Sequence, residues 1–171
     1  NQTEKMCIEA EKKEGYVLEN VIEQTYEICM EAVKMHGRAL MYVESQTPEI
    51  CMAAVKKDGR SLKFVKNQTP ELCMAAVKQN GMALEYVMEQ TPEICLEAVK
   101  QFGYALQYVI AQTEELCLTA VKHYKGALQC VISQTPEICA EALKRGWCDN
   151  DDDDETDAAI LYHIKDVNML K

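Results

Sequence analysis

Long apolar runs, histidines and glycine-rich loops are scarce in this 171-residue chain. No apolar run approaches the roughly 18 residues of a membrane-spanning helix, so the sequence predicts no such span. No charged-then-apolar leader opens the chain, and no secretory signal is visible. Because the chain begins at Asn1, already within a repeated pattern, we expect it to be a fragment or a processed chain.

Recognisable catalytic and metal-binding motifs are also missing. The three histidines are scattered, and none has a nucleophile at a familiar spacing: His36, His123 and His163. No CxxC pair suggests a zinc site, and the glycines are spaced as helix ends, not gathered in a phosphate-binding loop. We therefore expect no enzymatic activity, no cofactor and no metal site.

The bulk composition indicates a folded but acidic chain. Its hydrophobic content of 48% argues against disorder. Its net charge of −10 disfavours nucleic acid as a partner, because nucleic-acid binders usually carry a basic surface. Residues 46–67 are the one locally basic segment, and we keep this segment as an alternative site for nucleic acid or a nucleotide. Its cations are Lys56, Lys57, Arg60, Lys63 and Lys66.

A period of 22 residues dominates the sequence. The dipeptide Gln-Thr opens each unit, and six full units fill residues 2–133 without an insertion before a partial unit runs to about 147. The string QTPEIC occurs at 46–51, 90–95 and 134–139, with QTPELC at 68–73. The opening glutamines are Gln2, Gln24, Gln46, Gln68, Gln90, Gln112 and Gln134.

Each unit is predicted to form two short helices. Threonine after the glutamine is a good N-cap, and proline follows at the first helical position in four units. About ten residues later, Lys and Gly mark the helix end, as at Lys100 and Gly103. A second helix of about eight residues follows, for example at 82–89, and helices this short are stable only when stacked. The sequence therefore predicts an all-α fold, an α-solenoid of stacked two-helix repeats.

Seven of the nine cysteines occupy one place in the unit. They are Cys7, Cys29, Cys51, Cys73, Cys95, Cys117 and Cys139. Stacked helices lie about 8–10 Å apart, whereas a disulfide needs Cα atoms about 4.4–6.8 Å apart. We interpret these cysteines, and Cys130, as core residues. So many reduced thiols indicate a cytoplasmic protein.

The two exposed edges of the repeat differ in how much they vary. The first-helix edge carries a lysine at one place in every unit, whereas the second-helix edge and the turn before it change freely. Positions released from a structural need can diverge for recognition, although neutral drift of a solvated face explains the variation equally well. The candidate partner-binding residues are Arg38, Met41, Arg60, Lys63, Met82, Glu85, Phe102, Tyr104, Gln107, His123 and Tyr124.

Four of these candidates are predicted to form one aromatic patch on two adjacent units. They are Phe102, Tyr104, His123 and Tyr124. Aromatic residues are common anchors in protein interfaces. The alternative is that Phe102 and Tyr124 fold into the core at the end of the first helix.

The C-terminal part departs from the repeat. Residues 148–157 read as a solvated acidic linker, since an EF-hand loop counted from Asp149 would have Asp154 and Ile160 at its glycine and glutamate places. Residues 158–171 can form a short amphipathic helix that caps the repeat domain at 2–147 or starts a further segment.

The strings QTPEICLEAVKQFGYALQYVIAQT and CMAAVKQNGMALEYVMEQT resemble short helical repeats of bacterial and giant-virus proteins, in a family known as domain of unknown function 4116. The likeness covers residues 2–147. It departs at Glu11, where Val is expected, and at Lys125-Gly126, where Gly arrives one place late, so we expect a shifted turn or a looser core there. The resemblance implies a helical repeat fold and no enzyme, cofactor or binding residue.

The leading functional hypothesis is a non-catalytic scaffold that binds a protein or peptide through the second-helix edge and the turn. The alternatives are the nucleic-acid or nucleotide module at 46–67, a purely structural spacer, and a phage or viral decoy of a host factor. No membrane partner is expected. The sequence leaves the oligomeric state open, end-to-end association included.

Overall fold

The computed structural model describes residues 17–144 of the chain. This part is helical and contains no strand. It divides after Glu89 into two compact units, each of which contains several of the 22-residue repeats. The described residues of the first unit are 17–89, and those of the second unit are 90–144. Among the described helices, none combines the length and the apolar character that crossing a membrane would require.

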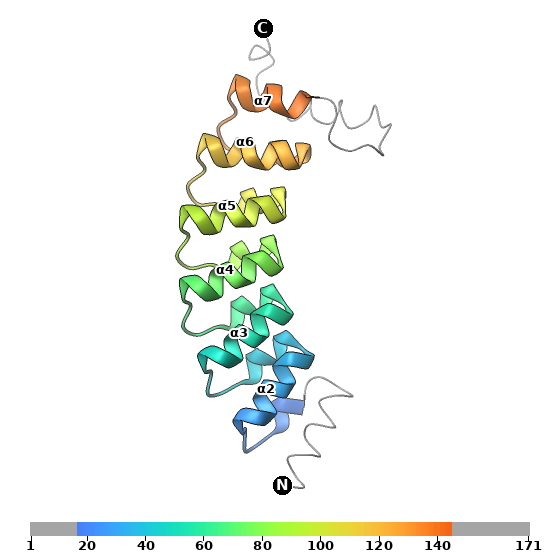
Figure 1. The fold of residues 1–171 in the computed structure, drawn as a ribbon, viewed down its shortest axis with the longest axis vertical. Coiled ribbons are helices and arrows are strands. Elements are labelled where there is room, and N and C mark those ends of the chain that lie inside the picture. The colour runs from blue at the N-terminus through green and yellow to red at the C-terminus, as the bar shows by residue number, and fades with distance from the viewer. Residues whose placement is uncertain (1–16, 145–171) are drawn as a thin grey trace, which may run out of the picture. The chain divides into compact units, whose positions relative to one another are not determined.

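The first unit alternates α-helices with shorter 3-10 helices, labelled η (Figure 1). The α-helices pack in sequence, α2 on α3 and α3 on α4, while η2 packs on η3 and η3 on η4. The unit therefore has one α layer and one 3-10 layer. Its elements are η1 (Val17–Asn20), α2 (Tyr26–Met35), η2 (Gly37–Tyr42), α3 (Pro48–Lys57), η3 (Gly59–Phe64), α4 (Pro70–Gln79) and η4 (Gly81–Tyr86).

The second unit repeats this plan. Helix α5 packs on α6 and α6 on α7, and η5 packs on η6. Its elements are α5 (Pro92–Gln101), η5 (Gly103–Tyr108), α6 (Glu114–His123), η6 (Lys125–Cys130) and α7 (Pro136–Leu143). The predicted all-α solenoid of two-helix repeats is confirmed. The proposed linker at 148–157 and helix at 158–171 lie outside the described residues.

Threonine starts the α-helices as predicted. In α3, Thr47 is the N-cap, and its hydroxyl accepts a hydrogen bond from Ile50 N at 3.4 Å. Pro48 fills the first helical position. The same cap opens every described α-helix from α2 to α7, with threonines Thr25, Thr47, Thr69, Thr91, Thr113 and Thr135.

The second helix of the repeat differs from the prediction. The expected helix at 82–89 is instead the six-residue 3-10 helix η4, which ends at Tyr86. Val87 N donates to Leu84 O at 3.1 Å, the tighter i→i+3 pattern that rarely lasts beyond a few residues. The carbonyl of Tyr86 then accepts a bond from the Gln68 side chain at 2.8 Å. The glutamine that opens the same repeat thus takes up a carbonyl that another helical turn would otherwise have satisfied.

The opening glutamine clamps neighbouring repeats together. Gln112 Nε2 donates to Leu106 O at 3.0 Å and to Cys130 O at 2.9 Å, the first in η5 and the second in η6. Gln112 Oε1 accepts from Ile132 N at 3.0 Å. One side-chain amide therefore ties the ends of two successive 3-10 helices. Gln24, Gln46 and Gln68 make the same set of bonds in the first unit.

The repeated cysteine completes the clamp. Cys117 Sγ lies 3.6 Å from Gln112 Oε1 and donates a weak thiol hydrogen bond to it. This fills the second acceptor position of the amide oxygen. The six described members of the cysteine ladder are buried, as predicted, whereas Cys130 is only half-buried. Cys7 lies outside the described residues.

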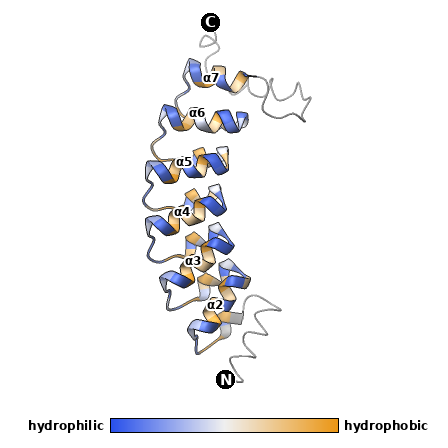
Figure 2. Cartoon of the chain, in the orientation of Figure 1, coloured by the Kyte–Doolittle hydropathy of each residue, from blue (hydrophilic) through white to orange (hydrophobic). Residues whose placement is uncertain are grey.

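A core of small and branched apolar residues fills the space between the α and 3-10 layers. In the repeat at 46–67, Ile50, Val55 and Leu62 are no more than 1% exposed. Hydrophilic residues gather at the ends of the α-helices (Figure 2). Ser61 is the exception in this core, because it is fully buried and its Oγ has no hydrogen-bond partner. Tyr108, in the second unit, is half-buried.

The glycines have a different role from the predicted helix C-cap. The cap of α2 is His36, in extended backbone, and Gly37 begins the next 3-10 helix. Gly37 is buried, and a Cβ placed on it would lie 2.6 Å from Ala54 O of the following repeat. A Cβ on Gly59 would likewise collide with Ala76 O. Glycine is therefore needed for close contact between repeats and not for left-handed backbone.

Candidate interaction surface

The turn from each α-helix into its 3-10 helix forms the edge that we call the rim. It comprises residues 34–38, 56–60 and 78–82 in the first unit, and 100–104 and 122–126 in the second. The residue before each 3-10 helix is its N-cap and adopts extended backbone. Its side chain therefore projects from the rim instead of lying within a helix.

In the first unit, two of these N-cap residues form a hydrogen bond from their side chain to the backbone of the 3-10 helix. Asp58 Oδ1 accepts from Arg60 N at 3.0 Å, and Asn80 Oδ1 accepts from Met82 N at 3.0 Å. His36 makes no such bond. A side-chain cap of this kind contributes about 1 kcal/mol to helix stability.

In the second unit, aromatic residues take the place of the caps. Phe102 and Tyr124 hold the N-cap positions of η5 and η6, and neither side chain makes a capping bond. The ring of Phe102 lies 5.3 Å from that of Tyr104 and 5.7 Å from that of Tyr124, between centroids. These three residues, here called the aromatic cluster, are all half-buried. Three of the four predicted patch residues are thus brought together, and Phe102 and Tyr124 remain accessible at the rim.

The rim glycines make room for the aromatic cluster. A Cβ on Gly103 would lie 2.6 Å from Tyr124 Cβ, and a Cβ on Gly126 would collide with the Tyr104 hydroxyl. Tyr124 Oη also donates to Gln101 O at 3.1 Å. The cluster is therefore seated on its own unit and does not swing freely in solvent.

The displaced glycine at Lys125-Gly126 does not shift the turn. Helix η6 spans Lys125–Cys130, which is 22 residues after the Gly103–Tyr108 span of η5. The prediction of a shifted turn is wrong, because Lys125 simply occupies the place where other repeats have a buried glycine and stays half-buried. Glu11, the other departure, lies outside the described residues.

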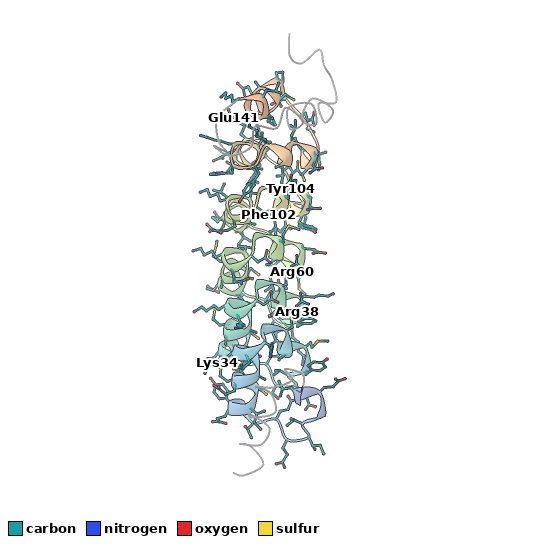
Figure 3. The ribbon with its side chains drawn as sticks, turned by 90° about the vertical axis from the view of Figure 1, so that its right-hand side faces the viewer. Lys34, Arg38, Arg60, Phe102, Tyr104 and Glu141 are labelled. Carbon is teal, nitrogen blue, oxygen red and sulfur yellow. The ribbon has the colours of Figure 1, made fainter. Side chains whose placement is uncertain are left out.

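The remaining candidates of the second unit lie beside the aromatic cluster. His123 is the last residue of α6 and is exposed. Gln107 is exposed on η5, and its Nε2 donates to Tyr104 O at 3.1 Å. Figure 3 shows Phe102 and Tyr104 close together on this side of the unit.

The first-unit candidates are spread along the 3-10 side of the repeats. Arg38 pairs with Asp58 of the next repeat at 3.2 Å, and Arg60 is exposed one repeat further along, above Arg38 in Figure 3. Lys63 Nζ lies 5.9 Å from the centroid of the Tyr86 ring. Met41 and Glu85 are also exposed, and Met82 is half-buried.

The basic segment 46–67 does not gather into one patch. Lys56 and Lys57 end α3, whereas Lys66 lies in the turn at the other end of η3. Lys66 Nζ donates to Glu44 O at 2.9 Å. The segment therefore offers its cations on separate edges, which weakens it as a phosphate site.

Sequence reasoning missed a row of exposed apolar residues at the opposite turn. In the second unit, Ile110 is 78% exposed and Ile132 is 67% exposed. Their backbone N–H groups bond to the clamp glutamines that open their own repeats, Ile110 N to Gln90 Oε1 at 3.0 Å and Ile132 N to Gln112 Oε1 at 3.0 Å. The backbone is fixed at this place while the type of side chain varies, as Glu44 and Lys66 at the same place illustrate. The sequence contains one signal for this row, which is that its members directly follow the buried valine that ends each repeat's 3-10 helix.

A shallow groove of about 470 Å³ lies between α6 and α7, away from the predicted residues. Its lining is mostly acidic around a leucine: Glu114, Glu115, Leu118, Thr119, Lys122 and Glu141. The groove is wide open to solvent and holds no converging set of buried polar groups. We therefore do not assign it a ligand.

The buried thiols are poorly suited to chemistry. Burial raises the pKa of Cys95 and of Cys117 above the ordinary value, and Glu114 raises that of Cys117 further. A raised pKa keeps the thiol protonated and unreactive at neutral pH. Within residues 17–144, no three His, Cys, Asp or Glu side chains gather where they could hold a metal ion.

Comparison with known proteins gives one family. The model of a family described as Domain of unknown function (DUF4116) matches the chain three times in overlapping windows, at residues 25–69, 47–91 and 69–112. Successive matches begin 22 residues apart, in register with the repeat. No curated protein and no solved structure matches the chain.

Proposed function

This chain belongs to the Domain of unknown function (DUF4116) family, and we propose that it is a non-catalytic scaffold that binds a protein or peptide. The contact surface is the rim together with the exposed side of the 3-10 helices. The aromatic cluster of the second unit is its anchor. The buried cysteines support a reducing compartment such as the cytoplasm.

One observation carries this proposal: aromatic residues replace the helix caps of the second unit. Asp58 and Asn80 show that the same backbone accepts a capping side chain. Phe102 and Tyr124 forgo a contribution of about 1 kcal/mol each. Departures from a local stability rule are expected at functional sites, and half-buried aromatic clusters are frequent anchors of interfaces.

The test is a double variant, Phe102→Asn with Tyr124→Asn, which restores the capping chemistry of Asp58 and Asn80. We expect it to remain folded, because each new cap offsets ring contacts worth about 0.5–1.5 kcal/mol. The wild-type chain and the variant serve as baits in an extract of the source organism. We expect one or more proteins to be retained by the wild type and lost from the variant.

Tyr26→Ala is the matched control. Tyr26 is 48% exposed and begins α2, at the turn opposite the rim. This control should keep every partner that the wild type binds. Partners that the rim variant retains as well as the wild type does, or the absence of any partner, would contradict the proposal.

A further inference from the structure

We infer that the rim of the second unit binds an extended acidic peptide segment that carries an aromatic or large apolar side chain. This inference rests on the function proposed above and names the chemistry of the partner. The two rim segments, 100–104 and 122–126, contain lysines and no acidic residue. Lys100 and Lys122 are exposed, and Lys125 is half-buried. The aromatic cluster therefore lies in a locally basic surface on an acidic protein.

Lys125 is the cation that the fold does not explain. Lys100 and Lys122 stand near the last turn of their α-helices, where a positive charge favours the helix dipole in every repeat. Lys125 instead begins a 3-10 helix, at a place where Gly59 and Gly103 are buried. A charge therefore stands at this place only in the repeat that also carries Tyr124.

The acidic residues at the starts of α5 and α6 lie far from the rim. Glu93 and Glu115 occupy the first turns of α5 and α6. Seven residues separate each from the rim lysine of its helix, or about 10 Å at 1.5 Å per residue. This distance exceeds the screening length of about 8 Å at physiological salt. Glu97 is one turn from Lys100, and Glu141 lines the same groove as Lys122. These two carboxylates offset part of the charge of Lys100, Lys122 and Lys125, which outnumber them.

The spacing of the repeat sets the spacing of the ligand. Lys100 and Lys122 occupy equivalent places on α-helices that pack side by side, and packed helices lie about 8–10 Å apart. An extended peptide advances about 3.3 Å per residue. Carboxylates three residues apart therefore match successive lysines. A ring or a branched apolar side chain of the peptide, placed between these two carboxylates, can lie against Phe102 and Tyr104.

A short acidic peptide fits this surface better than nucleic acid does. The positive region of the second unit covers two rim segments, whereas the whole chain has a net charge of −10. A long polyanion would extend past the rim and be repelled by the rest of the protein, whereas a short peptide meets only the local field.

The experiment is a selection of random peptides displayed on phage against the full chain. Peptides that bind the wild-type chain but not the double variant Phe102→Asn, Tyr124→Asn are kept as rim ligands. We expect these ligands to be enriched in Asp or Glu three residues apart around an aromatic or leucine. A fluorescent synthetic copy of the best ligand is then titrated against the protein. Lys122→Gln with Lys125→Gln should weaken its binding by about 2- to 10-fold, and Lys66→Gln, at an exposed lysine in the turn opposite the rim, should not.

The outcomes distinguish a failure of the acidic-peptide inference from a failure of the proposed binding function. Rim ligands that are neutral or basic, or that are indifferent to the two lysine changes, would overturn the acidic assignment and leave the aromatic anchor standing. A selection without any rim-dependent peptide would overturn both. A labelled single-stranded oligothymidine that binds the rim more tightly than the best peptide would also overturn the assignment, in favour of nucleic acid.

Discussion

Replacing Gln112 by alanine tests the clamp between repeats. The side chain makes three hydrogen bonds of 3.0 Å or less to backbone groups of η5, η6 and the following turn. A hydrogen bond of this kind contributes about 0.5–1.5 kcal/mol net. We therefore expect Gln112→Ala to lower the free energy of unfolding by about 3 kcal/mol, because no other side chain can reach all three groups.

Urea denaturation and thermal denaturation, both followed by circular dichroism, measure this change. In a chain of this size, 1 kcal/mol shifts Tm by about 2–4 °C, so Gln112→Ala should lower Tm by about 6–12 °C. Gln129→Ala is the control, since Gln129 is an exposed glutamine on η6. It should change stability by no more than about 0.5 kcal/mol. A loss below about 1 kcal/mol for Gln112→Ala would refute the clamp as the main link between repeats.

The isosteric change Gln112→Glu separates shape from hydrogen bonding. The new carboxylate still accepts from Ile132 N but faces the carbonyls of Leu106 and Cys130, so its charged form is disfavoured and its folded pKa is raised. Its protonated form is then the stabilising one. Stability should be highest below the unfolded pKa of Glu and fall as pH rises through the folded pKa. A variant whose stability relative to wild type is the same at all pH values would contradict this account.

Three further predictions follow from single side chains. Ser61→Ala should stabilise the protein by about 1 kcal/mol in urea unfolding, because Ser61 Oγ is buried without a partner; a destabilised variant would show that the hydroxyl is bonded. The pKa of Glu71 is held below its ordinary value by a backbone hydrogen bond and then by the Thr69 hydroxyl. Its contribution to stability is therefore present above the unfolded pKa and lost as pH falls through the folded pKa, and Thr69→Val should raise that pKa in an NMR titration. Cys95, whose pKa burial raises, should be alkylated only after unfolding when labelling is read at each cysteine by mass spectrometry, and rapid labelling of Cys95 in the native protein would contradict its burial.

The start of each α-helix could be predicted because its causes are local. Thr47 caps α3 and Pro48 fits its first position whatever surrounds them. The periodic apolar pattern likewise places Ile50 and Val55 in the core, where both are no more than 1% exposed. These features depend on residues within one turn of each other, so sequence alone contains the information.

The 3-10 helices and the clamp could not be predicted because their causes are not local. Tyr86 ends η4, and its carbonyl bonds to Gln68, which is 18 residues earlier. From the sequence, Gln68 is interpreted as a turn residue of its own repeat. Its side-chain amide lies between the ends of two 3-10 helices only because the repeats stack. Gly59 was assigned to the end of a helix for the same reason, since its contact with Ala76 O appears only when two repeats meet.

Repetition also shows which departures from the pattern deserve a functional explanation. Ser61 departs from the alanine of other repeats, and its buried hydroxyl gains no bond. Phe102 and Tyr124 depart from a capping residue, but their rings contact each other at 5.7 Å and remain half-buried at the rim. Drift at independent positions would scatter such changes, whereas these two stand in adjacent repeats at the same position, beside the displaced glycine of Lys125-Gly126. That coincidence is the reason for seeking the ligand at the second-unit rim and not at Ser61, although both depart from the repeat.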